Sequence, residues 1–166
     1  MSPGRPRPRW SAIRALVTDV DGVLTDGGLY YAENGDELKR FDVRDGQGLV
    51  LLREAGLLVA IVTRKETKIV TRRAHDLGIK EVHQNVIDKA AVVRDLLARH
   101  AVAPRDAAYV GDDVGDLPAM RLVGLPIAVK DAIPEVRRAA LYVTRSPAGH
   151  GALREISTLI LAARKP

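Results

Sequence analysis

The sequence contains no cysteine, so it can form no disulfide and offers no thiolate as a nucleophile or metal ligand. This absence excludes the small disulfide-stapled domains and favours a cytoplasmic protein. Long apolar runs are also missing: none approaches the length of a membrane span, and the N-terminus lacks the apolar stretch of a secretory signal. We therefore expect no association with a membrane.

Aromatic residues are scarce, at 4% of the chain, which leaves little material for stacking on nucleic-acid bases. The formal net charge of +5 would otherwise point to a nucleic-acid partner. Much of that excess comes from Arg5, Arg7 and Arg9, which alternate with proline in MSPGRPRPRW and cannot pack into a core. We expect no nucleic-acid partner, and a disordered basic tail over residues 1–10.

Residues 11–166 predict a single α/β domain, since 166 residues with 46% hydrophobic content can bury one sizeable core. Strand-length apolar runs alternate with helical patterns, which favours a three-layer, Rossmann-like parallel sheet with helices on both faces. The expected strands are Ile13–Thr18, Leu57–Thr63, Ala107–Val110, Leu125–Val129 and Leu141–Thr144. The expected helices are Gly46–Ala55, Glu66–Leu77, Ala90–His100, Leu117–Val123, Glu135–Ala140 and Ala152–Ala163.

One stretch interrupts this alternation. Leu29–Ala32 and Glu37–Phe41 flank Asn34-Gly35, a pair that readily takes the positive φ angles of a tight turn. The pattern predicts a β-hairpin. It follows directly on the acidic segment VTDVDGVLTD (17–26), so it can serve as a flap over whatever that segment binds.

The acidic segment places Asp19 and Asp21 at the end of the first predicted strand. Two carboxylates so close repel each other and lose hydration unless a cation or a proton lies between them. A D-x-D-G string alone is most often a solvated turn. Ligands of open parallel sheets, however, bind at the carboxyl ends of the strands, where Thr63 and GDDVGD (111–116) are also expected, with Lys89 at the start of the helix between them. Each alone has a structural explanation as a cap or a solvated charge; together they indicate one site.

This set of residues suits phosphoryl transfer. Mg²⁺ binds one or two carboxylates together with phosphate and water. An ionised carboxylate can act as nucleophile and form an aspartyl-phosphate, while a lysine and backbone N–H groups neutralise the phosphoryl oxygens. A second aspartate can protonate the leaving group and then activate water. The sequence therefore predicts a Mg²⁺-dependent phosphatase.

The motifs DVDGV (19–23), Thr63, Lys89 and GDDVGD resemble those of the haloacid-dehalogenase superfamily of Asp-nucleophile phosphatases. The resemblance implies that Asp19 is the nucleophile, Asp21 the general acid and base, and Thr63 and Lys89 the phosphate holders. The implied metal ligands are Asp19, Asp21 through its carbonyl oxygen and Asp112, with Asp116 nearby in support.

Only about forty residues separate Asp19 from Thr63, which leaves no room for an inserted cap domain. From about Ala15 to Leu161 the chain resembles the capless branch of 3-deoxy-D-manno-octulosonate 8-phosphate (KDO-8-phosphate) phosphatases. The strings that carry this resemblance are DVDGVLTDG, Y-x-x-x-x-G-x-E-L-K-x-F, YVGDDVGDLPAM and G-x-G-A-L-R-E. That branch implies a homotetramer in which the hairpin and C-terminal segment of neighbours close each site.

The resemblance also gives candidate substrate contacts, namely Gly22, Arg44, Arg64 and His150. Arg44 is equally well explained as a surface residue at a helix start. The chain departs from the branch in three places: Thr63-Arg64-Lys65 replaces the usual T-G-R, His150 stands where an arginine is usual, and the proline-arginine N-terminus has no counterpart. These changes leave the phosphatase chemistry intact and leave open which sugar is bound.

Three other interpretations compete with hydrolysis of KDO 8-phosphate. The chain could hydrolyse a nine-carbon sugar-acid 9-phosphate or a related pathway sugar phosphate. It could be an inactive oligomerising module, although the presence of Asp19, Asp21, Lys89 and Asp112 favours an enzyme. A receiver domain also has an acidic pocket, but its acceptor aspartate follows a later strand than its acidic pair, which the order of motifs here does not fit.

Overall fold

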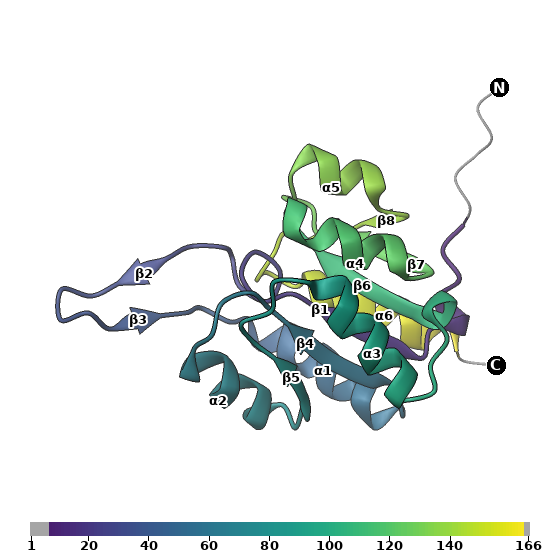
Figure 1. The fold of residues 1–166 in the computed structure, drawn as a ribbon, viewed down its shortest axis with the longest axis horizontal. Helices are drawn as coiled ribbons and strands as arrows, with labels where there is room; N and C mark the ends of the chain where they lie inside the picture. The colour runs from purple at the N-terminus through teal and green to yellow at the C-terminus, as the bar shows by residue number, and fades with distance from the viewer. Residues whose placement is uncertain (1–6, 165–166) are drawn as a thin grey trace.

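The central sheet of the computed structural model, which describes residues 7–164, has six parallel strands in the order β5-β4-β1-β6-β7-β8 (Figure 1). The strands are β1 (Ala15–Thr18), β4 (Leu58–Val62), β5 (Glu81–His83), β6 (Ala107–Gly111), β7 (Leu125–Ala128) and β8 (Tyr142–Val143). The central strand β1 is buried along its whole length. This is the expected result for a parallel strand that helices cover on both faces.

Helices cover the sheet on both sides, which confirms the predicted fold class (Figure 1). One face carries α1 (Val43–Glu54), α2 (Lys68–Asp76) and α6 (Ala152–Ala163). The other carries α3 (Lys89–Arg99), α4 (Leu117–Leu122) and α5 (Pro134–Ala139). Short 3₁₀ helices are η1 (Trp10–Ala12), η2 (Pro104–Asp106) and η3 (Val114–Asp116). No described helix is long and apolar enough to cross a membrane.

A buried carboxylate on α1 fixes the start of α6. Asp45 accepts hydrogen bonds from the backbone N–H groups of Gly151, at 3.1 Å, and Arg154, at 2.9 Å. Gly151 is the N-cap residue of α6 and has no side chain with which to cap it. Burial raises the pKa of Asp45, and these backbone donors oppose the rise. The C-terminal segment is thus anchored on the helix that follows the hairpin.

The predicted hairpin is present but shorter than expected, with antiparallel strands β2 (Tyr30–Tyr31) and β3 (Glu37–Leu38). It projects from the body at the left of Figure 1. Of the two turn residues, only Gly35 takes a positive φ, of 89°, and its N–H bonds to the Ala32 carbonyl at 3.0 Å. The turn therefore needs one left-handed residue where the sequence suggested two, as in three-residue hairpin loops.

Two further features differ from the sequence prediction. Strand β5 was not expected, because Glu81–His83 is short, only half-buried and at the sheet edge, where the apolar signal is weak. Trp10 was assigned to a disordered tail, yet it begins η1 and packs edge-on against Tyr142, with ring centroids 5.0 Å apart. Residues 1–6 of the predicted tail lie outside the described residues.

Candidate active site

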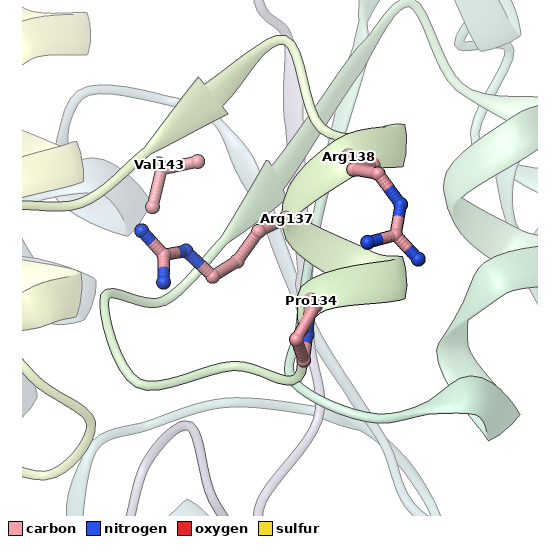
Figure 2. A pocket seen from close by; sticks show the side chains of 4 residues that line it. All are labelled: Pro134, Arg137, Arg138 and Val143. Atoms are coloured by element: carbon pink, nitrogen blue, oxygen red, sulfur yellow. The ribbon is translucent and has the colours of Figure 1, made fainter.

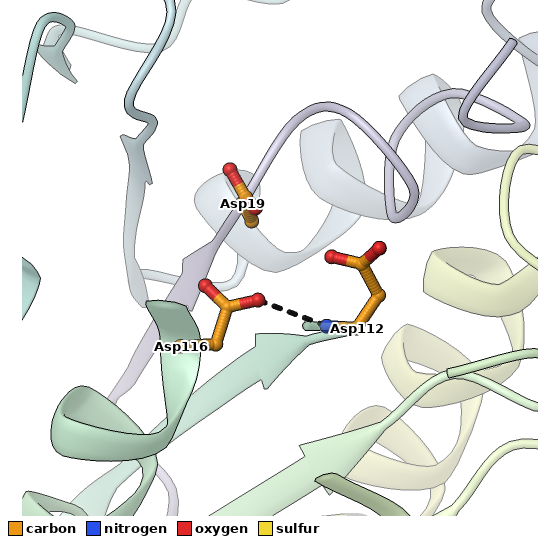
Figure 3. A group of neighbouring side chains, drawn as sticks. All are labelled: Asp19, Asp112 and Asp116. Carbon is orange, nitrogen blue, oxygen red and sulfur yellow. Dashed lines mark hydrogen bonds between the residues drawn. The ribbon is translucent and has the colours of Figure 1, made fainter. Parts of the chain in front are cut away.

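Three aspartates meet at the carboxyl ends of the central strands (Figure 3). Asp19 follows β1, Asp112 follows β6, and Asp116 lies in η3. One oxygen of each lies within 4.8 Å of the others. Since β1 and β6 are neighbours in the sheet, their ends bring together residues that are far apart in the sequence. The predicted acidic cluster is therefore assembled by the fold.

Asp19 is held by two donors. Its Oδ1 accepts the N–H of Val20 at 2.7 Å, and its Oδ2 lies 2.9 Å from the Lys89 ammonium. Burial and the charge of Asp116 raise the pKa of Asp19 to about 6, while Lys89 opposes the rise. The Lys89 side chain is 5% exposed and begins α3, where Asp88 caps the helix. A fixed cation thus stands beside the candidate nucleophile, where it can also hold a phosphoryl oxygen.

Asp116 organises this centre. Its two oxygens accept hydrogen bonds from Lys89 at 2.7 Å, the Tyr109 hydroxyl at 2.8 Å, and the N–H groups of Asp112 and Asp113 at 2.9 and 3.3 Å. The dashed line in Figure 3 marks the bond to the Asp112 N–H. With four donors satisfied, Asp116 is suited to fixing Lys89 and the following loop more than to binding a metal directly.

Asp112 has the opposite character. Its Oδ1 is buried without any hydrogen-bond partner among the described residues. Burial, followed by the negative charges of Asp116, Asp19 and Asp113, raises the pKa of Asp112 to about 8. A Cβ at Gly22 would collide with Oδ2 of Asp112, and Gly22 has a φ of +82°, so this position requires glycine. A buried, unpartnered carboxylate oxygen beside two other carboxylates fits a hard divalent cation such as Mg²⁺.

Asp21 lies apart from the three-aspartate cluster. Its carboxylate is 31% exposed and bonds to the Lys39 ammonium at 2.5 Å. Lys39 follows β3 of the hairpin and was not singled out in the sequence, because a lysine in a hairpin is ordinarily a solvated edge charge. The signal that could have found it is the position of the hairpin directly after the acidic segment. The hairpin thus contacts the predicted general acid within the same chain.

The cavity around these groups measures about 240 Å³. It is lined by Asp19, Asp21, Arg64, Lys89, Asp112, Asp113, Val114, Gly115 and Asp116. Thr63, 2% exposed, lies directly beyond the end of β4. Arg64 is exposed, whereas its neighbour Lys65 is paired with Glu37 of the hairpin at 2.6 Å. Of the two cations that replace the usual glycine and arginine, Arg64 is therefore the one available to a ligand.

Arg44 and His150, two further candidate contacts, lie together but do not line this cavity. The Arg44 guanidinium forms a fork with Asp42, with N–O distances of 3.1 and 3.0 Å, and reaches the His150 carbonyl at 3.4 Å. These bonds from Arg44 lower the pKa of Asp42 to about 2. Since Asp42 also caps α1, the single chain favours the helix-start interpretation of Arg44.

A larger hollow of about 310 Å³ lies beside α5 and is lined by Pro134, Arg137, Arg138 and Val143 (Figure 2). Arg137 extends toward Val143 of β8, while Arg138 leaves the other side of the helix. None of the four is a carboxylate or a nucleophile, so this hollow does not compete with the aspartate site for the chemistry.

Comparison with known proteins agrees with this geometry. Residues 58–156 match the family model of haloacid dehalogenase-like hydrolases. The chain is 47% identical over 152 residues to the 3-deoxy-D-manno-octulosonate 8-phosphate phosphatase KdsC of Escherichia coli K12, covering 92% of this chain and 81% of the relative. The match to KdsC of Yersinia pestis is 45% over 156 residues, or 94% and 83% of the two chains.

Solved structures of such phosphatases superpose closely on the fold. The Moraxella catarrhalis phosphatase, in complex with magnesium ion, phosphate ion and KDO, has a TM-score of 0.91 at 37% identity and covers 93% of this chain and 89% of its own. The cobalt-bound Haemophilus influenzae phosphatase has a TM-score of 0.91 at 41% identity, covering 95% and 92%. The chain belongs to the haloacid dehalogenase-like hydrolases, in the branch of 3-deoxy-D-manno-octulosonate 8-phosphate phosphatases.

Proposed function

We propose that the chain is a Mg²⁺-dependent phosphomonoesterase that hydrolyses an acidic sugar phosphate through an aspartyl-phosphate, with KDO 8-phosphate as the favoured substrate. The observation that carries this proposal is the cluster of buried Asp19 and Lys89 with half-buried Asp112, beside the separately held carboxylate of Asp21. Asp19 and Asp21 are two residues apart in the sequence and lie in different surroundings, so their carboxylates suit two different roles in one reaction.

In the first step, an oxygen of Asp19 attacks phosphorus, so an O–P bond forms to Asp19 and the ester O–P bond breaks. Asp21 donates its proton to the departing sugar oxygen. In the second step, Asp21 takes a proton from water, the water oxygen attacks phosphorus, and the Asp19–phosphorus linkage breaks to release phosphate. Lys89 and Thr63 hold the phosphoryl oxygens during both steps.

The residues present fit a divalent cation. The carboxylates of Asp19 and Asp112 and the main-chain carbonyl of Asp21 would hold it, while Asp116 fixes the surrounding loop. When bound, Mg²⁺ supplies neutralisation of the phosphoryl charge. The Moraxella catarrhalis relative was solved with magnesium, phosphate and KDO together, which supports this assignment.

The sugar itself is assigned from the relatives and from Arg64. An acidic sugar carries a carboxylate that an exposed arginine at the cavity wall, such as Arg64, can bind as a fork. Gly22, whose backbone borders Asp112, is a second candidate contact. The Arg64-Lys65 departure leaves a nine-carbon sugar-acid 9-phosphate as the alternative substrate.

We also propose a homotetramer held together by the hairpins. Leu29, Tyr31 and Leu38 are 60%, 67% and 63% exposed on the hairpin. An isolated two-stranded hairpin is marginally stable in water, so these apolar side chains need a partner, and closed symmetric oligomers are common. In such an assembly, Arg44 and His150 would contact substrate in a neighbouring subunit. The cytoplasmic location stays a prediction.

A phosphate-release screen over sugar phosphates, with and without Mg²⁺, tests this proposal. We expect the fastest release from KDO 8-phosphate in the presence of Mg²⁺. Fastest release from the nine-carbon 9-phosphate would establish the alternative. No release from any sugar phosphate, at a rate above that of Asp19→Asn, would instead support the inactive oligomerising module.

A further inference from the structure

The Lys39 side chain is the part of the hairpin that returns to the active site. Lys39 immediately follows β3, and its ammonium lies 2.5 Å from Oδ1 of Asp21 and 3.3 Å from Oε1 of Glu37. This side chain is 1% exposed, although the tip of the hairpin is open to solvent. An ammonium so deeply buried requires partners of opposite charge, and Asp21 and Glu37 supply them.

The bond from the Lys39 ammonium is the single hydrogen bond that the described residues make to the Asp21 side chain. Asp19, by contrast, is held by both a backbone N–H and Lys89. Without Lys39, nothing in the described chain would fix the direction of the Asp21 carboxylate. A group that must meet a leaving oxygen and then a water molecule depends on that direction.

Glu37 connects this contact to a second element. Its Oε1 also accepts from Lys65 at 2.6 Å, so four alternating charges run from Lys65 through Glu37 and Lys39 to Asp21. The Lys65 ammonium lies 5.8 Å from the centroid of the Tyr31 ring on the hairpin. The loop after β4, the hairpin and the acidic loop are thus joined by one chain of ion pairs.

We propose that Lys39 is a positioning residue for the reaction: it holds the Asp21 carboxylate in its working direction and makes that direction depend on the docked hairpin. This inference rests on the proposed phosphatase function. It assigns to the hairpin a role within its own chain, in addition to covering the site. Lys39 acts through Asp21 and needs no contact with substrate.

A double-mutant cycle tests this role, with phosphate release from the best substrate of the screen as the readout. Lys39→Met should lower kcat by about 10- to 100-fold with KM changed by less than about threefold. In the Asp21→Asn background, the same substitution should change kcat by less than about twofold, because the group it positions is already gone. Lys80→Met, at an exposed lysine directly before the amino end of β5, is the control and should leave kcat unchanged.

Equal losses in the two backgrounds, a loss confined to KM, or an unchanged kcat in Lys39→Met would each overturn the role of Lys39. Lys39→Gln keeps a hydrogen-bond donor on a side chain one atom shorter, so it should retain more activity than Lys39→Met. It also serves as the test variant if Lys39→Met does not fold. A wild-type chain that releases no phosphate would remove the proposed function itself, which separates the two failures.

Discussion

Two acidic sites at opposite ends of the central sheet respond to their surroundings in opposite ways. At the amino ends, Glu81 is surrounded by cations and histidines: it bonds to His100 at 2.8 Å, His83 at 2.9 Å and Arg99 at 3.3 Å. Burial opposes ionisation there, yet these partners hold the pKa of Glu81 at about 2. At the carboxyl ends, Asp112 has carboxylates as neighbours, and its pKa is raised to about 8.

This difference indicates that the Glu81 cluster stabilises the fold and that the acidic cluster around Asp112 serves function. Glu81 has partners for its charge within the folded chain, so its ionisation favours folding. Asp112 has repelling neighbours and a buried oxygen without a partner among residues 7–164, an arrangement that a fold tolerates where a ligand completes it. The acidic cluster at the carboxyl ends is therefore unfinished without a cation, whereas the Glu81 cluster is complete.

The largest effect is expected at Asp19, in the acidic cluster at the carboxyl ends of the strands. Asp19→Asn keeps the shape of the side chain but removes the attacking charge, so kcat should fall by roughly 10⁴-fold. The thermal midpoint should change little, because one repelling carboxylate is removed from the cluster and Lys89 keeps Asp116 as a partner. Steady-state phosphate release and thermal unfolding measure the two quantities. Near-normal turnover would eliminate Asp19 as the nucleophile.

Removal of divalent cations tests whether the acidic cluster at the carboxyl ends needs a cation to be complete, unlike the Glu81 cluster. A chelator should lower phosphate release by about 10²- to 10³-fold, and Mg²⁺ should restore it. Ca²⁺ prefers more ligands and a looser geometry, so it should bind yet support little turnover. Mg²⁺ should also raise the thermal midpoint of the wild-type chain and do so less in Asp112→Asn. Full activity in chelator would rule out the metal role of Asp112.

The hairpin tests whether the acidic site needs closure by a neighbour. Leu38→Glu places a charge on an apolar side chain that is 63% exposed. We expect the tetramer to dissociate and activity to fall by about tenfold, because water then enters the site. Light scattering and phosphate release at one protein concentration measure both. Asn34→Ala in the turn is the control. A fully active monomer would contradict the proposal that a neighbouring subunit closes the site.

The smallest effect is expected at Glu81. Its folded pKa, about 2, lies below the ordinary value of 4.5, so its ionisation stabilises the fold above pH 4.5 and this contribution is lost as pH falls toward 2. Glu81→Gln should lower the free energy of unfolding by roughly 1 kcal/mol near neutral pH, since salt and solvent screen the cluster. The difference from wild type should vanish near pH 2, and kcat should not change. A constant difference over this range would contradict the assignment.

Much of the fold follows from the sequence because its core strands are uniformly apolar. Strands β1, β4, β6 and β7 could be predicted, since each is an apolar run of strand length; helical patterns follow β4, β6 and β7, and the acidic segment follows β1. Strand β5 could not be, because it is short and carries one apolar residue, so only pairing with β4 defines it. The ordered position of Trp10 likewise depends on a contact with Tyr142, far along the chain.

The candidate site also has a part that the sequence predicts and a part that only the structure shows. Asp19 and Asp112 could be placed from strand ends, because parallel strands deliver their carboxyl ends to one edge of the sheet, and Lys89 from its position at the start of the helix between them. The contact of Lys39 with Asp21 and the cap that Asp45 gives to α6 could not be predicted in this way. The first depends on the hairpin folding back on the acidic loop, and the second on a side chain that reaches a helix far along the sequence. The contacts that we propose for Arg44 and His150 could not be derived from the sequence either, because they depend on a neighbouring subunit.

The covalent intermediate on Asp19 is the most direct test of the account. Asp21→Asn should still form the aspartyl-phosphate from p-nitrophenyl phosphate, whose leaving group needs no proton, and should hydrolyse it slowly. We would mix this variant with ³²P-labelled p-nitrophenyl phosphate and Mg²⁺, quench in acid and locate the label by peptide mapping. The account predicts label on the Asp19 peptide, removable by alkali and absent from the Asp19→Asn, Asp21→Asn double variant. Phosphate release with no label on the Asp19 peptide would contradict it.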